Sequence, residues 1–253
     1  RRRMRLVKGE MLSEWYDILK SEVKYYNALP IKEKKRFEAL MKIFLGEKHI
    51  TPVDTEINEK DKVLTAAGAI IPIFKLPGWE YSKLNEILIY PGGFNEDYEQ
   101  GKGGRIMGLV DGGTTMILSR TYLYSSFKDA DDGTNVGIHE FVHKIDGADG
   151  SIDGIPSFLL SSHGLIESWR KIMADELGRI RSGRSDINPY GGTNEAEFFS
   201  VVSEYFFEAP AKMKRKHQKL YDILKKIYRQ DTFSLFNAAL KDMIPVRFGR
   251  RSK

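Results

Sequence analysis

Residues 131–146 read DDGTNVGIHEFVHKID and contain the most informative pattern in the chain. A polar start followed by apolar residues at helical spacing predicts a helix over 134–146. His139 and His143 are four positions apart, so they share one face of that helix, one turn above each other. Two imidazoles placed in this way can bind one cation, and Glu140 beside the first can act on a bound water. The H-E-x-x-H pattern therefore predicts a metal site, against the alternative of two surface histidines and an incidental glutamate.

A catalytic zinc site also needs a third protein ligand and one open position. The chain has no cysteine, which excludes a thiolate ligand and a disulfide framework. Asp149, six residues after His143, is one candidate ligand. Asp146, three residues after the same histidine, is better placed to accept a hydrogen bond from an imidazole N–H. The alternative for Asp146 is an ordinary residue at the end of a helix.

A later segment offers a competing third ligand. Residues 194–208, NEAEFFSVVSEYFFE, predict a strongly apolar helix that carries Glu197 and Glu204. Their separation of seven residues is two turns, so both carboxylates point the same way. Buried carboxylates need a partner, and a metal ion or a histidine would supply one. The alternative is a solvated stripe on an amphipathic helix, so the residues alone leave the third ligand open.

The rest of the chain predicts an α+β fold that is mostly helical. Helices are predicted at 10–27, 31–45, 58–74, 134–146, 162–181, 194–208, 210–227 and 232–241. Strands are predicted at 86–90, 106–110 and 114–119, and a polar loop at 95–104. Because Asp111-Gly112-Gly113 joins the last two strands, we expect a hairpin there. The resulting small sheet should lie beside the H-E-x-x-H helix.

Composition and charge limit the classes of function. The 253 residues are 41% hydrophobic, enough for one sizeable core, and the net charge is +5. Because the basic residues gather at the two ends, the body is close to neutral, and we expect no nucleic-acid partner. No apolar run is long enough to cross a membrane. The arginine-rich start leads to the hypothesis of a membrane anchor upstream of Arg1, with a domain that faces the cytoplasm. A cytoplasmic location also fits the lack of cysteine.

Five stretches together resemble the Mlc titration factor A (MtfA) family of bacterial zinc peptidases. They are IYPGGF at 89–94, HEFVHKID at 139–146, GIP at 154–156, NEAEFF at 194–199 and SEYFFEAP at 203–210. They occur in the family's order across roughly residues 26–240, so the first ~25 residues and the basic tail lie outside the resemblance. The sequence departs from the family at Glu195, where a proline is common. The resemblance implies a zincin-like fold with an active-site core similar to that of anthrax lethal factor.

The resemblance also implies roles for single residues. One zinc ion per chain would be bound by His139, His143 and Glu197. Glu140 would be the catalytic base, and the hydroxyl of Tyr190 would donate a proton to a developing oxyanion. From its sequence context alone, a tyrosine in this loop would be assigned to packing. As a weaker hypothesis, Asp146 and Glu204 hold the ligand imidazoles in the required tautomer.

These inferences predict a gluzincin-like zinc metallopeptidase domain over 29–242. Residues 1–28 would form a basic N-terminal segment with a helical extension, and 243–253 a basic tail. We expect peptide or protein substrates, with aminopeptidase activity as one expectation. The resemblance offers a different function as an alternative, a regulatory protein that sequesters a transcriptional repressor and whose peptidase activity is secondary.

Overall fold

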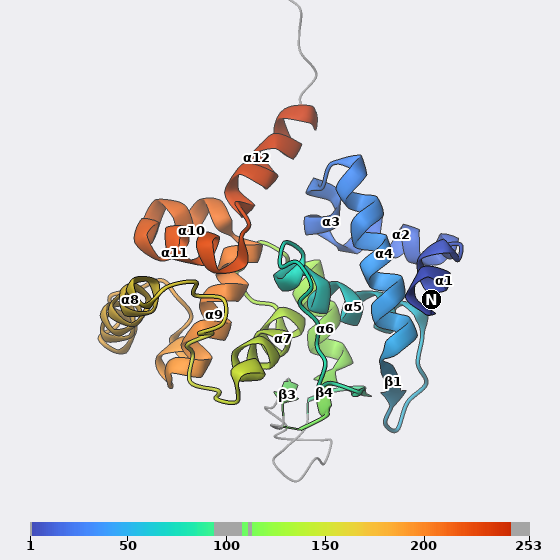
Figure 1. Ribbon diagram of the computed structural model, residues 1–253, viewed down its shortest axis with the longest axis horizontal. Helices are drawn as coiled ribbons and strands as arrows, with labels where there is room; N and C mark the ends of the chain where they lie inside the picture. The colour runs from blue at the N-terminus through green and yellow to red at the C-terminus, as the bar shows by residue number, and fades with distance from the viewer. Residues whose placement is uncertain (1, 94–107, 111–112, 244–253) are drawn as a thin grey trace, which may run out of the picture.

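The computed structural model describes residues 2–93, 108–110 and 113–243 (Figure 1). The α-helices are α1 (Arg2–Lys8), α2 (Ser13–Glu22), α3 (Lys24–Ala28), α4 (Ile31–Glu47), α5 (Glu59–Ile73), α6 (Arg120–Lys128), α7 (Val136–Asp146), α8 (His163–Arg181), α9 (Glu195–Glu208), α10 (Pro210–Lys216), α11 (Gln218–Tyr228) and α12 (Thr232–Met243). The strands are β1 (His49–Pro52), β2 (Glu86–Tyr90), β3 (Gly108–Val110) and β4 (Thr115–Ser119), and two 3₁₀ turns are η1 (Gly147–Asp149) and η2 (Pro189–Gly192). The fold is α+β and mostly helical, which confirms the prediction.

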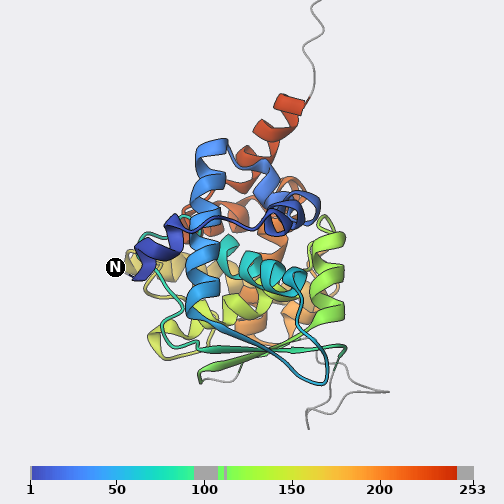
Figure 2. The ribbon, with the colours of Figure 1, turned by 90° about the vertical axis from the view of Figure 1, so that its right-hand side faces the viewer.

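The sheet has its strands in the order β1-β2-β4-β3. β1, β2 and β4 run parallel, whereas β3 pairs antiparallel with β4 and places Leu109 opposite Ile117. Ile87 and Ile89 of β2 are fully buried and alternate with less buried residues, so one face of the sheet covers the core. Figure 2 shows the helices stacked on one side of the sheet. The short outer strand β3 contacts α7, as expected for a sheet beside the H-E-x-x-H helix.

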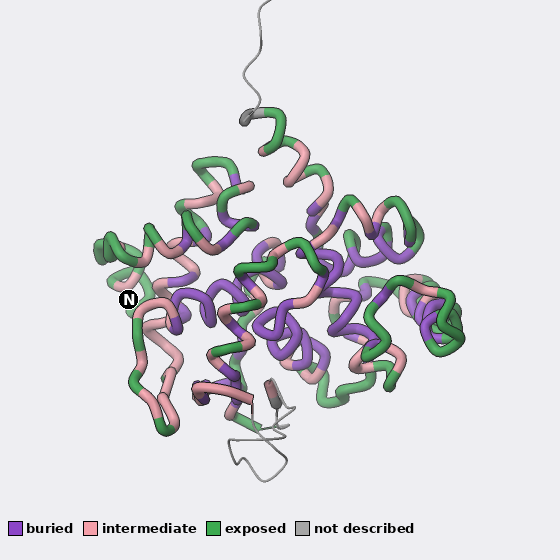
Figure 3. Tube along the Cα trace, turned by 180° about the vertical axis from the view of Figure 1, so that it is seen from behind, coloured by how far each residue is buried: buried purple, intermediate pink, exposed green. Residues whose placement is uncertain are grey.

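The centre of the molecule is a layer of three helices, with α7 packed between α5 and α9. Figure 3 shows that this region is almost entirely buried. α5 begins with a capping box, in which the side chain of Asn58 and the side chain of Asp61 each accept from the other's backbone N–H. α5 and α7 approach closely at Gly68, where an added Cβ would lie 3.0 Å from the backbone carbon of Gly137. A side chain at position 68 would therefore force α5 and α7 apart.

The N-terminal helices pack on this core. Leu6 of α1 covers Gly46 of α4, where an added Cβ would lie 2.6 Å from Leu6 Cδ2. Arg3 forms ion pairs with Glu47 and Glu80, which fixes α1 to the body of the protein. α2 and α4 both pack on α5. Among the helices of the described residues, none is both long and apolar enough to cross a membrane.

Two predicted helices are each interrupted once. The helix expected over 10–27 breaks at Val23, which has φ −105° and ψ 89° and separates α2 from α3. The helix expected over 210–227 breaks at His217, which has φ −132° and ψ 52° and separates α10 from α11. The break places the buried imidazole of His217 between the carboxylates of Glu176 and Asp186. Helical periodicity cannot predict this contact, because it joins segments far apart in the sequence.

β1 and α6 were not predicted. β1 has only four residues and ends in Pro52, so it is too short to show an alternating pattern. α6 contains three aromatic residues and two serines in nine positions, a composition that does not favour a helix by itself. Of the predicted strand over 106–110, residues 108–110 are seen as β3, and they pair antiparallel with β4 as expected. Residues 111–112 of the predicted hairpin turn lie outside the described residues. The predicted loop at 95–104 lies outside the described residues.

Candidate metal centre

The metal-motif helix α7 is fixed at its start by Asn135. The side-chain Oδ1 of Asn135 accepts a hydrogen bond from the backbone N–H of Ile138 at 3.0 Å, which is an N-cap. Because α5 and α9 cover the helix, its chemistry-bearing residues are largely removed from water. His139 and His143 are each 9% exposed, and Glu140 is 5% exposed. Buried polar groups at this density require partners on a neighbouring element.

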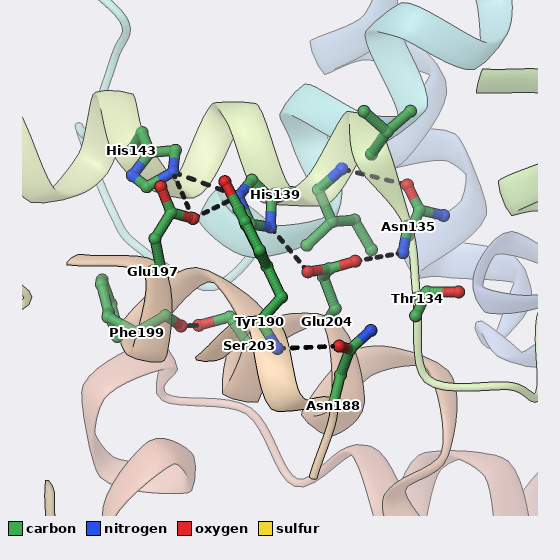
Figure 4. Close-up of polar contacts among 12 residues, drawn as sticks. Thr134, Asn135, His139, His143, Asn188, Tyr190, Glu197, Phe199, Ser203 and Glu204 are labelled. Atoms are coloured by element: carbon green, nitrogen blue, oxygen red, sulfur yellow. Dashed lines mark hydrogen bonds and ion pairs between the residues drawn. The ribbon is translucent and has the colours of Figure 1, made fainter. Parts of the chain in front are cut away.

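The partner element is α9, which brings Glu197 to the two imidazoles (Figure 4). Glu197 Oε2 lies 3.0 Å from His139 Nε2 and 3.4 Å from His143 Nε2, and the two Nε2 atoms lie 3.1 Å apart. Ligands bound tetrahedrally to Zn²⁺ at ~2.0–2.1 Å are ~3.3 Å from one another. The three atoms therefore already have the spacing of three corners of a zinc tetrahedron, and two nitrogens with one carboxylate oxygen suit that ion.

The charges at these three atoms agree with a cation site. Burial would raise the pKa of Glu197, but its hydrogen bonds to His139 and His143 hold that pKa well below its usual range. Burial would lower the pKa of His139, yet the neighbouring carboxylates of Glu204, Glu197 and Glu140 raise it well above the ordinary value. When no cation is bound, a proton on His139 compensates the neighbouring carboxylates. A divalent cation would replace that positive charge.

Glu204, two turns along α9 from Glu197, contacts the other side of His139. Glu204 Oε1 lies 2.7 Å from His139 Nδ1, and Glu204 Oε2 accepts a hydrogen bond from the backbone N–H of Asn135. Asn135 Nδ2 in turn donates to Glu208 Oε1 at 2.9 Å. One carboxylate thus contacts both the cap of α7 and its first histidine. A bond at Nδ1 leaves Nε2 of His139 free to bind a metal ion.

Glu140 lies on the sheet side of the site. A Cβ added at Gly108 of β3 would lie 2.4 Å from Glu140 Oε1, so the carboxylate packs directly on the backbone of the outer strand. Burial raises the pKa of Glu140 above its usual value. A side chain at position 108 would force the Glu140 carboxylate to shift from this position. A carboxylate with a raised pKa is better matched to accepting a proton near neutral pH.

Tyr190 lies in η2, on the open side of the site. Its ring centroid is 5.9 Å from that of His139, and Figure 4 shows the hydroxyl directed toward the two imidazoles. The side chain of Asn188 accepts a hydrogen bond from Tyr190 N at 3.0 Å, which shapes this turn. Tyr190 is 51% exposed, so a substrate can reach its hydroxyl. Partial burial and the nearby carboxylates raise the pKa of Tyr190 to about 12, which keeps it protonated and able to donate at neutral pH.

The aspartates after the histidine pair contact other groups. Asp146 is fully buried, and its Oδ2 accepts a hydrogen bond from the backbone N–H of Gly154 at 2.8 Å. Asp146 Oδ1 and His143 Nδ1 each have no hydrogen-bond partner among the described residues. Asp149 is exposed, and its carboxylate accepts from Ser151 N and Ser157 Oγ. The three-residue cluster of possible ligand atoms contains neither aspartate.

Three further residues complete the site. Asn135, Glu208 and Gly108 were not singled out from the sequence. The N-cap position of Asn135 and the four-residue spacing between Glu204 and Glu208 were visible signals for two of them. No local pattern marks Gly108, because its close contact with Glu140 arises only when β3 is placed beside α7.

A cavity of about 530 Å³ opens beside His143 and Glu197. It is also lined by Ile152, Asp153 and Glu195. The ligand atoms are therefore close to a space that a substrate can enter from solvent. Three of its lining residues carry carboxylates, so the cavity favours a positively charged group.

Comparison with known proteins identifies the family. The sequence model described as glucose-regulated metallo-peptidase M90 matches residues 1–229, including the N-terminal residues that the motifs alone left outside the resemblance. The chain is 28% identical over 242 residues to Mlc titration factor A of Serratia proteamaculans, covering 88% of this chain and 89% of that protein. It is 28% identical over 219 residues to Mlc titration factor A of Pectobacterium atrosepticum, covering 79% and 80%. An uncharacterized protein of Synechocystis is 28% identical over 242 residues, covering 90% and 87%. With a family match over most of its length, the chain belongs to the glucose-regulated metallo-peptidase M90 family.

Proposed function

We propose that this protein is a zinc-dependent peptidase that hydrolyses peptide bonds, with one Zn²⁺ held by His139, His143 and Glu197. The observation that carries the proposal is the spacing of the three ligand atoms, 3.0–3.4 Å, at the edge of a cavity. When bound, Zn²⁺ supplies Lewis acidity, which lowers the pKa of a water and polarises a carbonyl. This is the gluzincin-like arrangement, with two histidines from one helix and a glutamate from another.

The chain's own residues would carry the proton transfers. Glu140 accepts the proton of the attacking water and then delivers it to the leaving amine, for which its raised pKa is suited. The Tyr190 hydroxyl donates a hydrogen bond to the developing oxyanion, for which its accessible and protonated state is suited. Glu204 fixes the tautomer of His139 through Nδ1. Asp146 remains a weaker prediction for His143, because the hydrogen bond found for it goes to Gly154.

The acidic lining of the cavity favours aminopeptidase activity. Asp153 and Glu195 line the space beside His143 and Glu197. Their carboxylates could bind the free α-ammonium of a substrate next to the scissile bond. An endopeptidase would not need this charge.

Removing the metal tests the reaction and its specificity together. We expect the protein to release p-nitroaniline from aminoacyl p-nitroanilides, and to lose more than about 90% of that activity after dialysis against 1,10-phenanthroline. Stoichiometric Zn²⁺ should restore it. N-acetylated versions of the same substrates should be hydrolysed at least about tenfold more slowly. Activity that survives complete metal removal would refute the zinc mechanism, and equal rates on acetylated substrates would refute the aminopeptidase assignment alone.

Glu204→Gln should weaken zinc binding by about tenfold to a hundredfold. The amide cannot serve both Asn135 N and His139 Nδ1 as an acceptor without rotating its NH₂ group toward a donor. Zinc affinity, measured by competition with a chromogenic chelator, checks this expectation. Glu195→Gln, on the same helix but exposed, is the matched control. Equal zinc affinities of the Glu204 variant and the wild type would show that the contact does not tune the metal site.

A second candidate function comes from the names of the relatives. Proteins similar to this chain are called Mlc titration factor A, which indicates a link to a regulator. A regulatory role here would predict binding of a transcriptional repressor that does not depend on the Glu140 carboxylate. We also propose a cytoplasmic location, because a transcriptional repressor would be encountered there. These regulatory assignments rest on the relatives' names, whereas the peptidase proposal rests on the site.

A further inference from the structure

The position of Tyr190 is set by the loop between α8 and α9. At the end of this loop, Arg181 Nε donates a hydrogen bond to the carbonyl of Gly192 at 2.8 Å. Gly192 also lies against Ile180, where an added Cβ would be 2.9 Å from Ile180 Cγ2. The loop is therefore fixed to α8 just after Tyr190. Before Tyr190, the loop is fixed by a different residue.

Asp186, four residues before Tyr190, is the point where other elements converge. Asp186 Oδ1 lies 2.8 Å from His217 Nε2, at the junction of α10 and α11. Asp186 Oδ2 accepts hydrogen bonds from Tyr205 Oη on α9 and from Lys216 Nζ on α10, each at 3.0 Å. One carboxylate thus joins the loop to two helices and a helix junction.

The charges around Asp186 make this anchor strong. His217 has a side chain only 1% exposed, and its Nδ1 lies 3.2 Å from Glu176 Oε2 on α8. Burial would lower the pKa of His217, but the adjacent Glu176 carboxylate and the hydrogen bond with Asp186 raise it above the ordinary value. Burial would raise the pKa of Asp186, yet the bonds to His217, Lys216 and Tyr205 hold it well below its usual range. Removing either carboxylate would leave the buried imidazole of His217 with one charged partner instead of two, which is expected to cost free energy of folding.

The segment between the anchor and Tyr190 transmits this fixed position. Ile187 is buried at 2% exposure, and Asn188 bonds the backbone N–H of Tyr190. Tyr205 follows Glu204 directly on α9, so the same helix supplies a metal-ligand partner and an anchor for the loop. The sequence separation is short, Ile187 is packed in the core and Asn188 is hydrogen-bonded to Tyr190 N, which limits the freedom between the carboxylate of Asp186 and the ring of Tyr190.

We propose that Asp186, held by His217, Tyr205 and Lys216, is a positioning residue that places the Tyr190 hydroxyl beside the metal site. The inference rests on the proposed role of Tyr190 in stabilising the oxyanion. Asp186 itself acts through the loop. Its contribution should therefore appear in the chemical step and should depend on the presence of the tyrosine hydroxyl.

A double-mutant cycle in the zinc-loaded full chain tests the proposal. Tyr190→Phe should lower kcat by about a hundredfold. Asp186→Asn alone should lower kcat by about tenfold, with KM within about twofold of wild type and unchanged zinc content. In the Tyr190→Phe background, Asp186→Asn should lower kcat by less than about twofold, because the hydroxyl it positions is gone. An undiminished tenfold loss in that background, or a full kcat in Tyr190→Phe, would overturn the inference.

Two further variants separate positioning from loss of structure. Tyr205→Phe removes only one hydroxyl from the anchor and keeps the ring, so it should fold and show a smaller kcat loss that also vanishes in the Tyr190→Phe background. Asp175→Asn makes the same chemical change at an exposed position of α8 and should leave kcat unaltered. A kcat loss in Asp175→Asn equal to that of Asp186→Asn would count against positioning by the anchor.

A measurement without substrate distinguishes failure of this inference from failure of the proposed function. With 3-fluorotyrosine placed at position 190, the ¹⁹F resonance should shift or broaden in Asp186→Asn and stay unchanged in Asp175→Asn. An identical spectrum in both variants would overturn the positioning role even if the protein proves to be an active zinc peptidase. Conversely, an inactive protein that shows the shift would refute the peptidase proposal while leaving the anchor in place.

Discussion

Glu140→Gln is expected to lower kcat by about 10³-fold, roughly 4 kcal/mol of activation free energy, while zinc content stays at one ion per chain. The amide has the size and shape of the carboxylate but cannot accept the proton of an attacking water. Folding should be preserved, because burial raises the pKa of Glu140 and the site therefore tolerates an uncharged side chain. The close contact with Gly108 is also maintained by an isosteric change. Steady-state kinetics and elemental analysis on the same preparation provide the measurement.

The matched control for this variant is Glu167→Gln, which changes an exposed glutamate on α8 that pairs with Arg170 one turn away. Its kcat should equal that of the wild type. If Glu140→Gln retains wild-type kcat with full zinc content, Glu140 is not the base. If it loses zinc as well as activity, the carboxylate has a structural role at the metal site, and the kinetic result no longer reports on proton transfer.

The sequence predicted which side chains of this site lie together better than it predicted the contacts that surround them. The four-residue spacing of His139 and His143 and the seven-residue spacing of Glu197 and Glu204 place side chains on one face of a helix by geometry alone. Because the predicted helices over 134–146 and 194–208 form, both carboxylates meet the histidine pair. The spacing could not predict which nitrogen of His139 each carboxylate contacts. In the structure Glu197 contacts Nε2 and Glu204 contacts Nδ1.

Contacts between segments that are distant in the sequence could not be predicted from local patterns. Gly108 matters because a three-residue strand passes over Glu140, and nothing in the local sequence marks that approach. The break at His217 is similar, since residues 210–227 have the apolar spacing of one helix. The helix ends there because the buried imidazole reaches Asp186 and Glu176, which lie 31 and 41 positions earlier. Periodicity predicts which face of a helix is buried, whereas these two features depend on which polar group a distant segment places against that face.

Glu197→Ala is expected to lose zinc. The substitution removes the proposed oxygen ligand and leaves His139 and His143 as the other two proposed ligands, so zinc affinity should fall by more than the roughly 10–100-fold expected for an outer partner. Elemental analysis after identical dialysis should give one zinc per wild-type chain and a small fraction of that in the variant. Glu195→Ala is the matched control, because Glu195 lies on the same turn of α9 but is exposed, and it should keep its zinc.

The result also decides between the ligands that the sequence left open. Full zinc retention in Glu197→Ala would point to Asp146 or Asp149 as the third ligand. Asp146 would then have to release the backbone N–H of Gly154, and Asp149 would have to leave its two serine partners and turn inward from solvent. Either change would require the segment after α7 to move. By contrast, Glu197 Oε2 already lies 3.0 and 3.4 Å from the two Nε2 atoms, the spacing expected between two ligands of one zinc ion. Its helix begins at the N-cap Asn194, whose side chain accepts a hydrogen bond from Glu197 N. A site that needs no rearrangement is expected to bind metal more tightly than one that does, so zinc loss in Glu197→Ala is the expected outcome.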